Sequence, residues 1–290
     1  MTRIDTPASK WSALYQAHWT LLALALVFLA IAAPARASTS ITLGVVPQFE
    51  QRKLFATWKP IVDELSQRTG LEVKLAVTLT VQEFEQELEK GSFDFVYANP
   101  YHILKVSTSQ GYIPLVRDRE PLHGILVVRR DSPLRKVEEL AGKTLAVPSP
   151  NALGASLLIQ ADLQHVFKTQ MSLLNVRTHS SVYLHVLNGL ADAGGGVEKT
   201  LSELYPSVRY ALRVLYTTRP MPSHPIAAHP RIARQIREKM QKALLEMGNT
   251  PSGKGLLDDV PMPYPEKTTL EDYLPMRQWG LDTYWQGSRK

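Results

Sequence analysis

The spacing of hydrophobic residues from residue 41 onward switches repeatedly between the periods of helices and strands. Apolar residues three and four apart, such as Leu54, Trp58, Ile61 and Leu65, mark one helical face. Short apolar or alternating runs between such segments predict strands at 41–46, 71–77, 93–97, 112–116, 122–128, 144–147, 173–177, 191–194, 208–216 and 225–228. Helices are predicted at 50–69, 81–90, 99–110, 153–167, 181–190, 230–247, 251–258 and 268–285, with one helical turn at 137–143.

Residues with special backbone roles stand at the ends of these segments. Gly70 and Gly111 follow predicted helices, where glycine commonly ends a helix. Thr80 precedes a helix as a plausible N-cap, and Asn99 precedes another with Pro100 at its first position. These local signals agree with the hydrophobic periods.

The order of the elements predicts an α/β fold with two lobes. Strands that alternate with helices indicate parallel sheets covered on both faces, and two such runs occur, at roughly 41–120 and 143–216. Extended segments at 122–129 and 208–228 are the expected crossings between them. We therefore expect the first part of lobe 1 at 38–125 and lobe 2 at 126–217. Residues 218–290 would return to lobe 1 and add C-terminal helices, leaving a ligand cleft between the lobes.

The N-terminal segment has the pattern of a signal peptide. An apolar run of 13 residues at 21–33 follows Arg3 and Lys10 and precedes the small residues around Ala37. A spanning helix needs about 20 apolar residues, so this run is short. We expect residues 1–37 to be a signal peptide cleaved after Ala37, which places the protein in the periplasm. The alternative is an uncleaved N-terminal anchor.

Composition narrows the classes further. The 290 residues are 44% hydrophobic and 21% charged, as in ordinary folded proteins. The chain has no cysteine, which excludes disulfides, iron–sulfur clusters, thiolate metal sites and lipid attachment through a cysteine. The net charge of +6 is spread along the chain without a long basic run, so we expect no nucleic-acid partner and a weak preference for anionic ligands.

No catalytic or metal motif is present. The chain lacks a G-x-S-x-G elbow, H-E-x-x-H, a Walker loop and G-x-G-x-x-G. Its eight histidines are scattered, and neither the pair His179 and His185 nor the pair His224 and His229 has the i,i+4 spacing of a helical metal site. The glycines at 194–196 are interpreted as a tight strand-to-helix turn rather than a ligand contact. We expect no enzyme activity, no metal and no cofactor.

Candidate ligand contacts lie where predicted strands end and helices begin, because ligands of open α/β sheets bind beyond the carboxyl ends of strands. Free N–H groups at helix N-termini there suit anions. For several of these residues the alternatives remain open: Asn99, Ser149 and Asn151 could act purely as helix caps, and Tyr97 could be a core residue. His123, near a crossing, is a weaker candidate. The candidates are Gln48, Tyr97, Asn99, Ser149, Asn151, Ala152, Thr178, His179 and Ser180.

Four segments in chain order resemble the periplasmic substrate-binding proteins of phosphonate, phosphite and phosphate ABC transporters. They are the stretch from Val46 through Gly70, Phe93–Pro100 (FDFVYANP), Leu140–Val147 (LAGKTLAV), and Thr178-His179 with VLNGLADA at 186–193. The resemblance covers nearly the whole chain after the signal peptide. It implies the type II periplasmic-binding fold, an oxyanion ligand, and contacts from Tyr97, the 149–152 loop and His179.

The leading functional interpretation is a periplasmic solute-binding protein. It would capture a small oxyanion, such as phosphonate, phosphite or phosphate, for the membrane permease of an ABC importer. The alternative is a ligand-sensing module that works with a membrane sensor kinase, and the motifs do not separate the two. An exported enzyme using His179 is disfavoured because no nucleophile–base pair is visible. By analogy of fold we expect a monomer.

Overall fold

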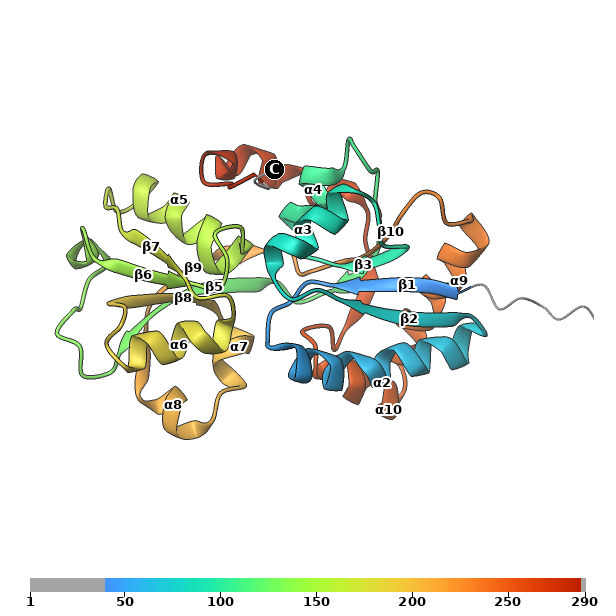
Figure 1. Cartoon of the computed structure of the whole chain (residues 1–290), viewed down its shortest axis with the longest axis horizontal. Helices are drawn as coiled ribbons and strands as arrows, with labels where there is room; N and C mark the ends of the chain where they lie inside the picture. The colour runs from blue at the N-terminus through green and yellow to red at the C-terminus, as the bar shows by residue number, and fades with distance from the viewer. Residues whose placement is uncertain (1–39, 288–290) are drawn as a thin grey trace, which may run out of the picture. The chain divides into compact units, whose positions relative to one another are not determined.

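The computed structural model describes residues 40–287, which form two mixed β-sheets flanked by helices (Figure 1). The first sheet has the strand order β11-β4-β10-β3-β1-β2 and the second β7-β6-β8-β5-β9. The strands of the first sheet are β1 (Ser40–Val45), β2 (Glu72–Val77), β3 (Phe95–Tyr97), β4 (Ile113–Asp118), β10 (Ile226–Ala228) and β11 (Pro265–Lys267). Those of the second are β5 (Leu122–Arg129), β6 (Thr144–Val147), β7 (Ser172–Asn175), β8 (Ala193–Val197) and β9 (Leu212–Met221).

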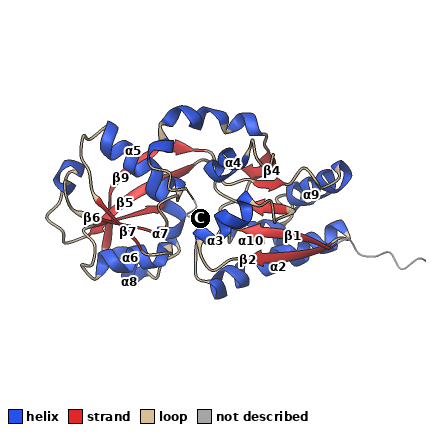
Figure 2. Ribbon diagram, turned by 45° about the horizontal axis from the view of Figure 1, so that its top comes forward, coloured by secondary structure: helices blue, strands red, loops and turns tan. Residues whose placement is uncertain are grey.

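Helices lie on both sides of each sheet, as Figure 2 shows. Around the first sheet they are α2 (Gln51–Thr69), α3 (Val81–Glu89), α4 (Pro100–Val106), α9 (Arg234–Met247) and α10 (Pro251–Asp258). Around the second they are α5 (Leu158–His165), α6 (His179–Leu187), α7 (Glu198–Ser202) and α8 (Pro206–Tyr210), with a 3-10 turn η1 (Val137–Leu140) and a π-helical turn η2 (Leu153–Leu157). The central strands β3, β5 and β8 are buried along most of their length, as expected where helices cover both faces of a sheet.

The predicted sheets are parallel only in part. β1 runs parallel to β2 and β3, and β6 runs parallel to β7 and β8. The remaining strands pair antiparallel: β10 with β3 and β4, β11 with β4, and β5 with β8 and β9. Parallel neighbours need a crossover, usually a helix. β5 and β10 enter their sheets directly from the other sheet and have no such crossover.

The segments that join the two sheets are short. β4 ends at Asp118 and β5 begins at Leu122, while β9 ends at Met221 and β10 begins at Ile226. The predicted lobe boundaries at 125/126 and 217/218 therefore fall inside β5 and β9. The predicted signal peptide, 1–37, lies outside the described residues. Within the described residues, none of the helices combines the length and hydrophobicity that a membrane span requires.

Local capping agrees with the sequence at several helix ends. Gly70 adopts a left-handed conformation with φ 63° after α2. The Thr80 side chain accepts a hydrogen bond from the Glu83 amide, and the Asn99 side chain accepts one from the His102 amide. These caps fix where α3 and α4 begin, and the start of α4 faces the cleft described below.

The predictions for residues 194–196, 208–216 and 268–285 were wrong in part. The glycines at 194–196 belong to β8 instead of a turn, and a Cβ on Gly195 would overlap the carbonyl oxygen of Ala155. Residues 206–210 form α8, so β9 starts only at Leu212. The last segment splits into three 3-10 helices because Pro275 and Gly280, the latter with φ 69°, interrupt a continuous helix. These are η3 (Leu270–Asp272), η4 (Leu274–Trp279) and η5 (Leu281–Thr283).

The C-terminal segment packs against elements of both halves. One apolar cluster joins Tyr101 and Leu104 of α4 to Leu158 of α5, and it includes Tyr273 and Leu281 of the C-terminal segment. The main core of the first sheet is a separate cluster that contains Leu43, Phe95 and Trp58. The C-terminal residues therefore hold α4 and α5 together beside the cleft.

Candidate functional site

A small cavity of about 40 Å³ lies where strands of both sheets end. Val46, Pro47 and Gln48 follow β1, and Pro148 and Ala152–Ala155 follow β6. The other lining residues are Val81, Asn99, His102, His179, Val197, Met221 and His224. We call this cavity the cleft. Its position at the carboxyl ends of parallel strands is where α/β sheets bind ligands.

The described residues that line the cleft include no lysine, arginine, aspartate or glutamate. Their titratable side chains are the histidines His102, His179 and His224. The π-helical turn η2 begins at Leu153 and continues into helix α5 at Leu158, and helix α6 begins at His179, so the starts of two helical segments border the cleft. The first amides of a helix have no intrahelical acceptor and carry partial positive charge, which favours an anion.

His179 is fixed by its neighbours and is almost fully buried. It follows the N-cap Thr178, its Nδ1 lies 3.4 Å from the Thr200 hydroxyl, and 5% of its surface is exposed. Its amide donates to the Gln48 carbonyl at 3.3 Å, which joins a loop of the first sheet to a helix of the second. Burial lowers the pKa of His179 to about 4. The imidazole is therefore uncharged at neutral pH.

His224 contacts the cleft from the segment between β9 and β10. Its Nδ1 lies 3.3 Å from the Tyr97 hydroxyl and 3.5 Å from the Gln48 amide nitrogen. Burial, with repulsion from His102 and His179 in addition, lowers its pKa to about 3. Burial raises the pKa of Tyr97, so the phenol keeps its hydrogen and can orient the His224 ring.

For His179 and His224 the structure shows hydrogen-bond contacts at Nδ1 and none at Nε2 among the described residues. Each ring is thus oriented through one nitrogen while the other remains available to a ligand. An anion placed between them would favour the protonated rings, because an opposite charge at short range raises a histidine pKa. At neutral pH, an anion in the cleft therefore favours a positive charge on these rings.

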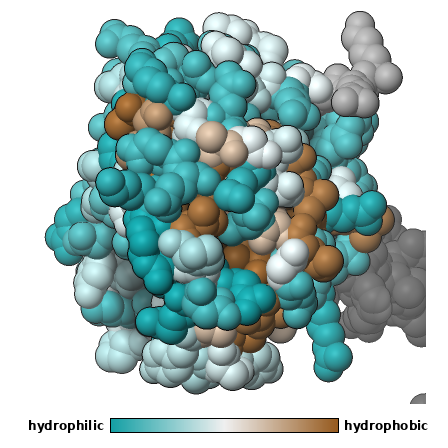
Figure 3. All heavy atoms as spheres, turned by 90° about the vertical axis from the view of Figure 1, so that its left-hand side faces the viewer, coloured by the Kyte–Doolittle hydropathy of each residue, from teal (hydrophilic) through white to brown (hydrophobic). Residues whose placement is uncertain are grey.

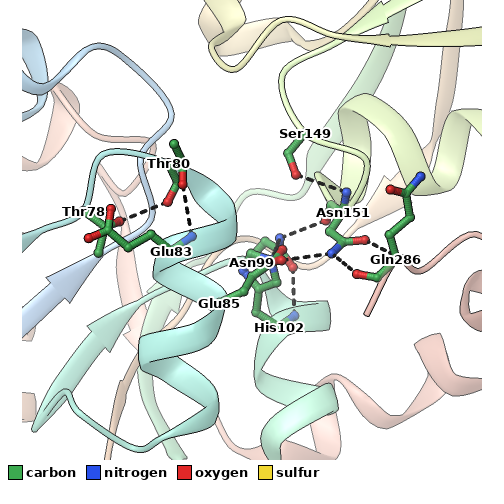
Figure 4. A network of polar contacts seen from close by, with 9 residues as sticks. All are labelled: Thr78, Thr80, Glu83, Glu85, Asn99, His102, Ser149, Asn151 and Gln286. Atoms are coloured by element: carbon green, nitrogen blue, oxygen red, sulfur yellow. Dashed lines mark hydrogen bonds and ion pairs between the residues drawn. The ribbon is translucent and has the colours of Figure 1, made fainter. Parts of the chain in front are cut away.

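A buried polar network forms the wall of the cleft on the side of α3 and α4 (Figure 4). The Glu85 carboxylate lies 2.9 Å from His102 Nε2 and accepts from the Asn151 amide at 3.0 Å. Asn151 also exchanges hydrogen bonds with the Gln286 backbone, at 2.8 and 2.9 Å. These contacts connect α3, α4, the loop after β6 and the C-terminal segment.

One family model matches most of the chain. The family model described as "ABC transporter, phosphonate, periplasmic substrate-binding protein" matches residues 43–273. The chain belongs to this family. A comparison with curated proteins finds no match.

Solved structures of binding proteins share the fold of this family member. A binding protein component of an ABC phosphonate transporter from Pseudomonas aeruginosa is 18% identical, with a TM-score of 0.74, over 83% of this chain and 85% of that one. PhnD1 from Prochlorococcus marinus, in complex with methylphosphonate, is 15% identical with a TM-score of 0.75 over 85% and 98%. A Xanthomonas citri protein bound to a chloride ion is 17% identical with a TM-score of 0.70 over 84% and 98%.

Family membership confirms the main sequence predictions. The family match confirms the resemblance to phosphonate-type binding proteins and the interpretation as a periplasmic solute-binding protein of an ABC transporter. The solved structures confirm the two-lobed type II periplasmic-binding fold. The family consists of substrate-binding transport proteins that work with an ABC permease.

The structure brings several predicted contact residues of this family member together. Gln48, Asn99, Ala152 and His179 line the cleft. Tyr97 is buried and reaches the cleft through His224. The other four lie behind or beside it: Ser149 accepts from the Asn151 amide, Asn151 joins the Glu85 network, Thr178 caps α6, and Ser180 is half-buried outside the lining. Ligand contact by any of these residues stays a prediction.

Three residues of the cleft wall were not predicted from the sequence. His224 gave only a weak signal, a histidine within a proline- and histidine-rich segment. Glu85 looked like a surface position of an amphipathic helix, although it is buried at 5% exposure. His102, which lines the cleft, was not predicted either, although it follows the candidate Asn99 by three positions and such a spacing brings side chains together on a helix.

Proposed function

We propose that this protein binds a small oxyanion, such as phosphonate, phosphite or phosphate, in the cleft between its two sheets. The proposal rests on the kinds of residue that line the cleft. Three histidines and the starts of two helical segments surround the cavity, and no carboxylate faces it among the described residues. Such a site offers N–H donors to an anion, and hydrogen bonds to a charged acceptor are about twice as strong as neutral ones.

The size of the cavity supports a small ligand. At about 40 Å³ it holds only a few groups the size of a water molecule. The similar protein from Prochlorococcus marinus is in complex with methylphosphonate, a ligand of this size class. A bulky organic substituent on the anion would need the two halves to separate.

The further details of the proposal follow from the family and the sequence. We propose that the chain has no catalytic turnover, acts as a monomer, is cleaved after Ala37, and delivers its ligand to an ABC permease rather than to a sensor kinase. The exposed large apolar residues of the second half include Val166, Leu184 and Leu190. Figure 3 shows that hydrophilic side chains cover most of the face it draws, with some apolar surface between them. Some exposed apolar surface is normal on a monomer.

The test is a thermal-shift panel on protein purified from the periplasm of cells that express the full chain. Phosphate, phosphite, methylphosphonate and sulfate are added separately, and the mass of the purified chain reports the cleavage site. A ligand at 100 times its dissociation constant stabilises by about 2.7 kcal/mol, which gives a clear rise in Tm.

Substitution locates the site. His179→Asn and His224→Asn should each abolish the ligand-dependent rise, whereas the matched control His165→Asn, on an exposed ring at the end of α5, should keep it. A flat response of the wild-type protein to every phosphorus oxyanion would refute the proposed ligand class.

A further inference from the structure

The buried pair Glu85 and His102 includes a ring nitrogen that the proposed anion contacts do not use. Both side chains are nearly inaccessible to water, at 6% and 1% exposure, and Glu85 Oε1 lies 2.9 Å from His102 Nε2. His102 lines the cleft. Its other ring nitrogen, Nδ1, is buried and has no hydrogen-bond partner among the described residues.

The neighbouring groups determine which ring nitrogen carries the hydrogen. An ionised carboxylate only accepts hydrogen bonds, and Glu85 Oε2 already accepts from the Asn151 amide at 3.0 Å. Glu85 Oε1 therefore requires a hydrogen on His102 Nε2. The Asn99 side-chain NH2 group lies 3.2 Å from Nε2 but only donates, because Asn99 Oδ1 accepts from the His102 backbone, so it cannot accept this hydrogen. Its other neighbour is the Asn151 carbonyl, 3.5 Å away, to which it can donate instead.

A neutral imidazole with its hydrogen on Nε2 has a lone pair on Nδ1. In this form His102 would offer an acceptor to a ligand, whereas the other parts of the lining offer N–H groups to an anion. A buried acceptor without a partner is unfavourable. Because His102 lines the cleft, a ligand bound there could satisfy it, and such a ligand would have to donate a hydrogen.

We propose that His102, oriented by Glu85, is a specificity-determining residue that accepts a hydrogen bond from a protonated oxygen of the ligand. The inference rests on the proposed function and narrows its ligand class to oxyanions that carry a hydrogen, such as hydrogen phosphate and the hydrogen anions of phosphite and alkylphosphonates. Sulfate, which has no hydrogen at neutral pH, would place a bare oxygen against the Nδ1 lone pair. Such a repulsive contact is a means of rejecting a competitor of the same shape.

The decisive variant is Glu85→Gln in the full chain. The new amide oxygen can still accept from Asn151, while its NH2 group donates to His102 Nε2. The ring hydrogen then moves to Nδ1, which changes from acceptor to donor. Glu83→Gln is the matched control, because Glu83 lies on the same helix, is exposed, and makes no contact with His102 among the described residues.

Isothermal titration with methylphosphonate and with sulfate at about pH 6 measures the preference between the two anions. We expect Glu85→Gln to lower the ratio of methylphosphonate affinity to sulfate affinity by about tenfold, with sulfate binding gained, and Glu83→Gln to leave the ratio unchanged. A ratio in Glu85→Gln within twofold of the wild-type ratio overturns the inference and leaves oxyanion binding intact. A wild-type protein that binds neither anion refutes the proposed function and the inference together.

A second measurement covers the case in which Glu85→Gln does not fold. Nitrogen NMR of the wild-type protein with labelled histidine assigns the hydrogen of each ring. A hydrogen on Nε2 of His102, with an Nδ1 resonance that shifts when methylphosphonate is added, supports the proposal. A hydrogen on Nδ1, or an Nδ1 resonance unaffected by the ligand, overturns it.

Discussion

Acidification should weaken the ligand-free protein through His179, and the size of the effect follows from its burial. The pKa of His179 is lowered from 6.5 to about 4 by burial. The unfolded chain therefore binds a proton as the pH falls through 6.5, while the folded chain stays unprotonated until about pH 4. Because the unfolded state binds more protons in this window, the free energy of unfolding decreases as the pH falls.

One pKa unit corresponds to about 1.4 kcal/mol. Between pH 7 and pH 5 the shift at His179 therefore removes about 2 kcal/mol of stability, and the full effect is reached only below its folded pKa. His224, whose pKa is lowered to about 3, acts in the same direction. His224 is half-buried and borders the cleft, so we base the magnitude on His179 alone.

Urea denaturation of the wild type and of His179→Gln at pH 7, 6 and 5 measures this contribution. Carboxylates also titrate in this range, but they do so in both proteins and cancel in the difference. We expect the stability of the wild type to fall by about 2 kcal/mol more than that of His179→Gln between pH 7 and 5. Equal pH dependence in the two proteins would refute the assignment of His179 as a buried neutral group. Added methylphosphonate should reduce the loss in the wild type, because a bound anion favours the imidazolium.

Three further substitutions test the structure around the cleft. Tyr97→Phe keeps the buried ring but removes the hydroxyl 3.3 Å from His224, so methylphosphonate affinity by calorimetry should fall about tenfold with stability lowered by only about 1 kcal/mol. Gly195→Ala would push a Cβ into the Ala155 carbonyl, and urea denaturation should show a loss of about 1–3 kcal/mol. Thr80→Ala removes the N-cap of α3 and should lower the free energy of unfolding by about 1 kcal/mol without changing ligand affinity.

Local signals in the sequence predicted most of the elements and part of the cleft. Gly70, Thr80 and Asn99 act where their backbone chemistry indicated, because helix ends depend on neighbouring residues. Gln48 and His179 were found as candidate lining residues because both follow strands, and strand ends converge in an α/β fold.

Features that depend on distant contacts were not visible in the sequence. His224 meets Tyr97 across 127 residues, and the pairing of Glu85 with Asn151 spans 66. Hydrophobic periods describe only residues close together in the chain, so they could not predict either contact. The antiparallel direction of β10 likewise results from the return of the chain from the second sheet to the first. The sequence of its three residues does not indicate this direction.

A crystal structure of the protein grown with methylphosphonate tests the central claim most directly. The account predicts the phosphonate group in the cleft, with its oxygens in hydrogen-bond contact with the imidazoles of His179 and His224 and near the first amides after Ala152. Methylphosphonate bound elsewhere, or a cleft that stays empty at saturating ligand concentration, would contradict it.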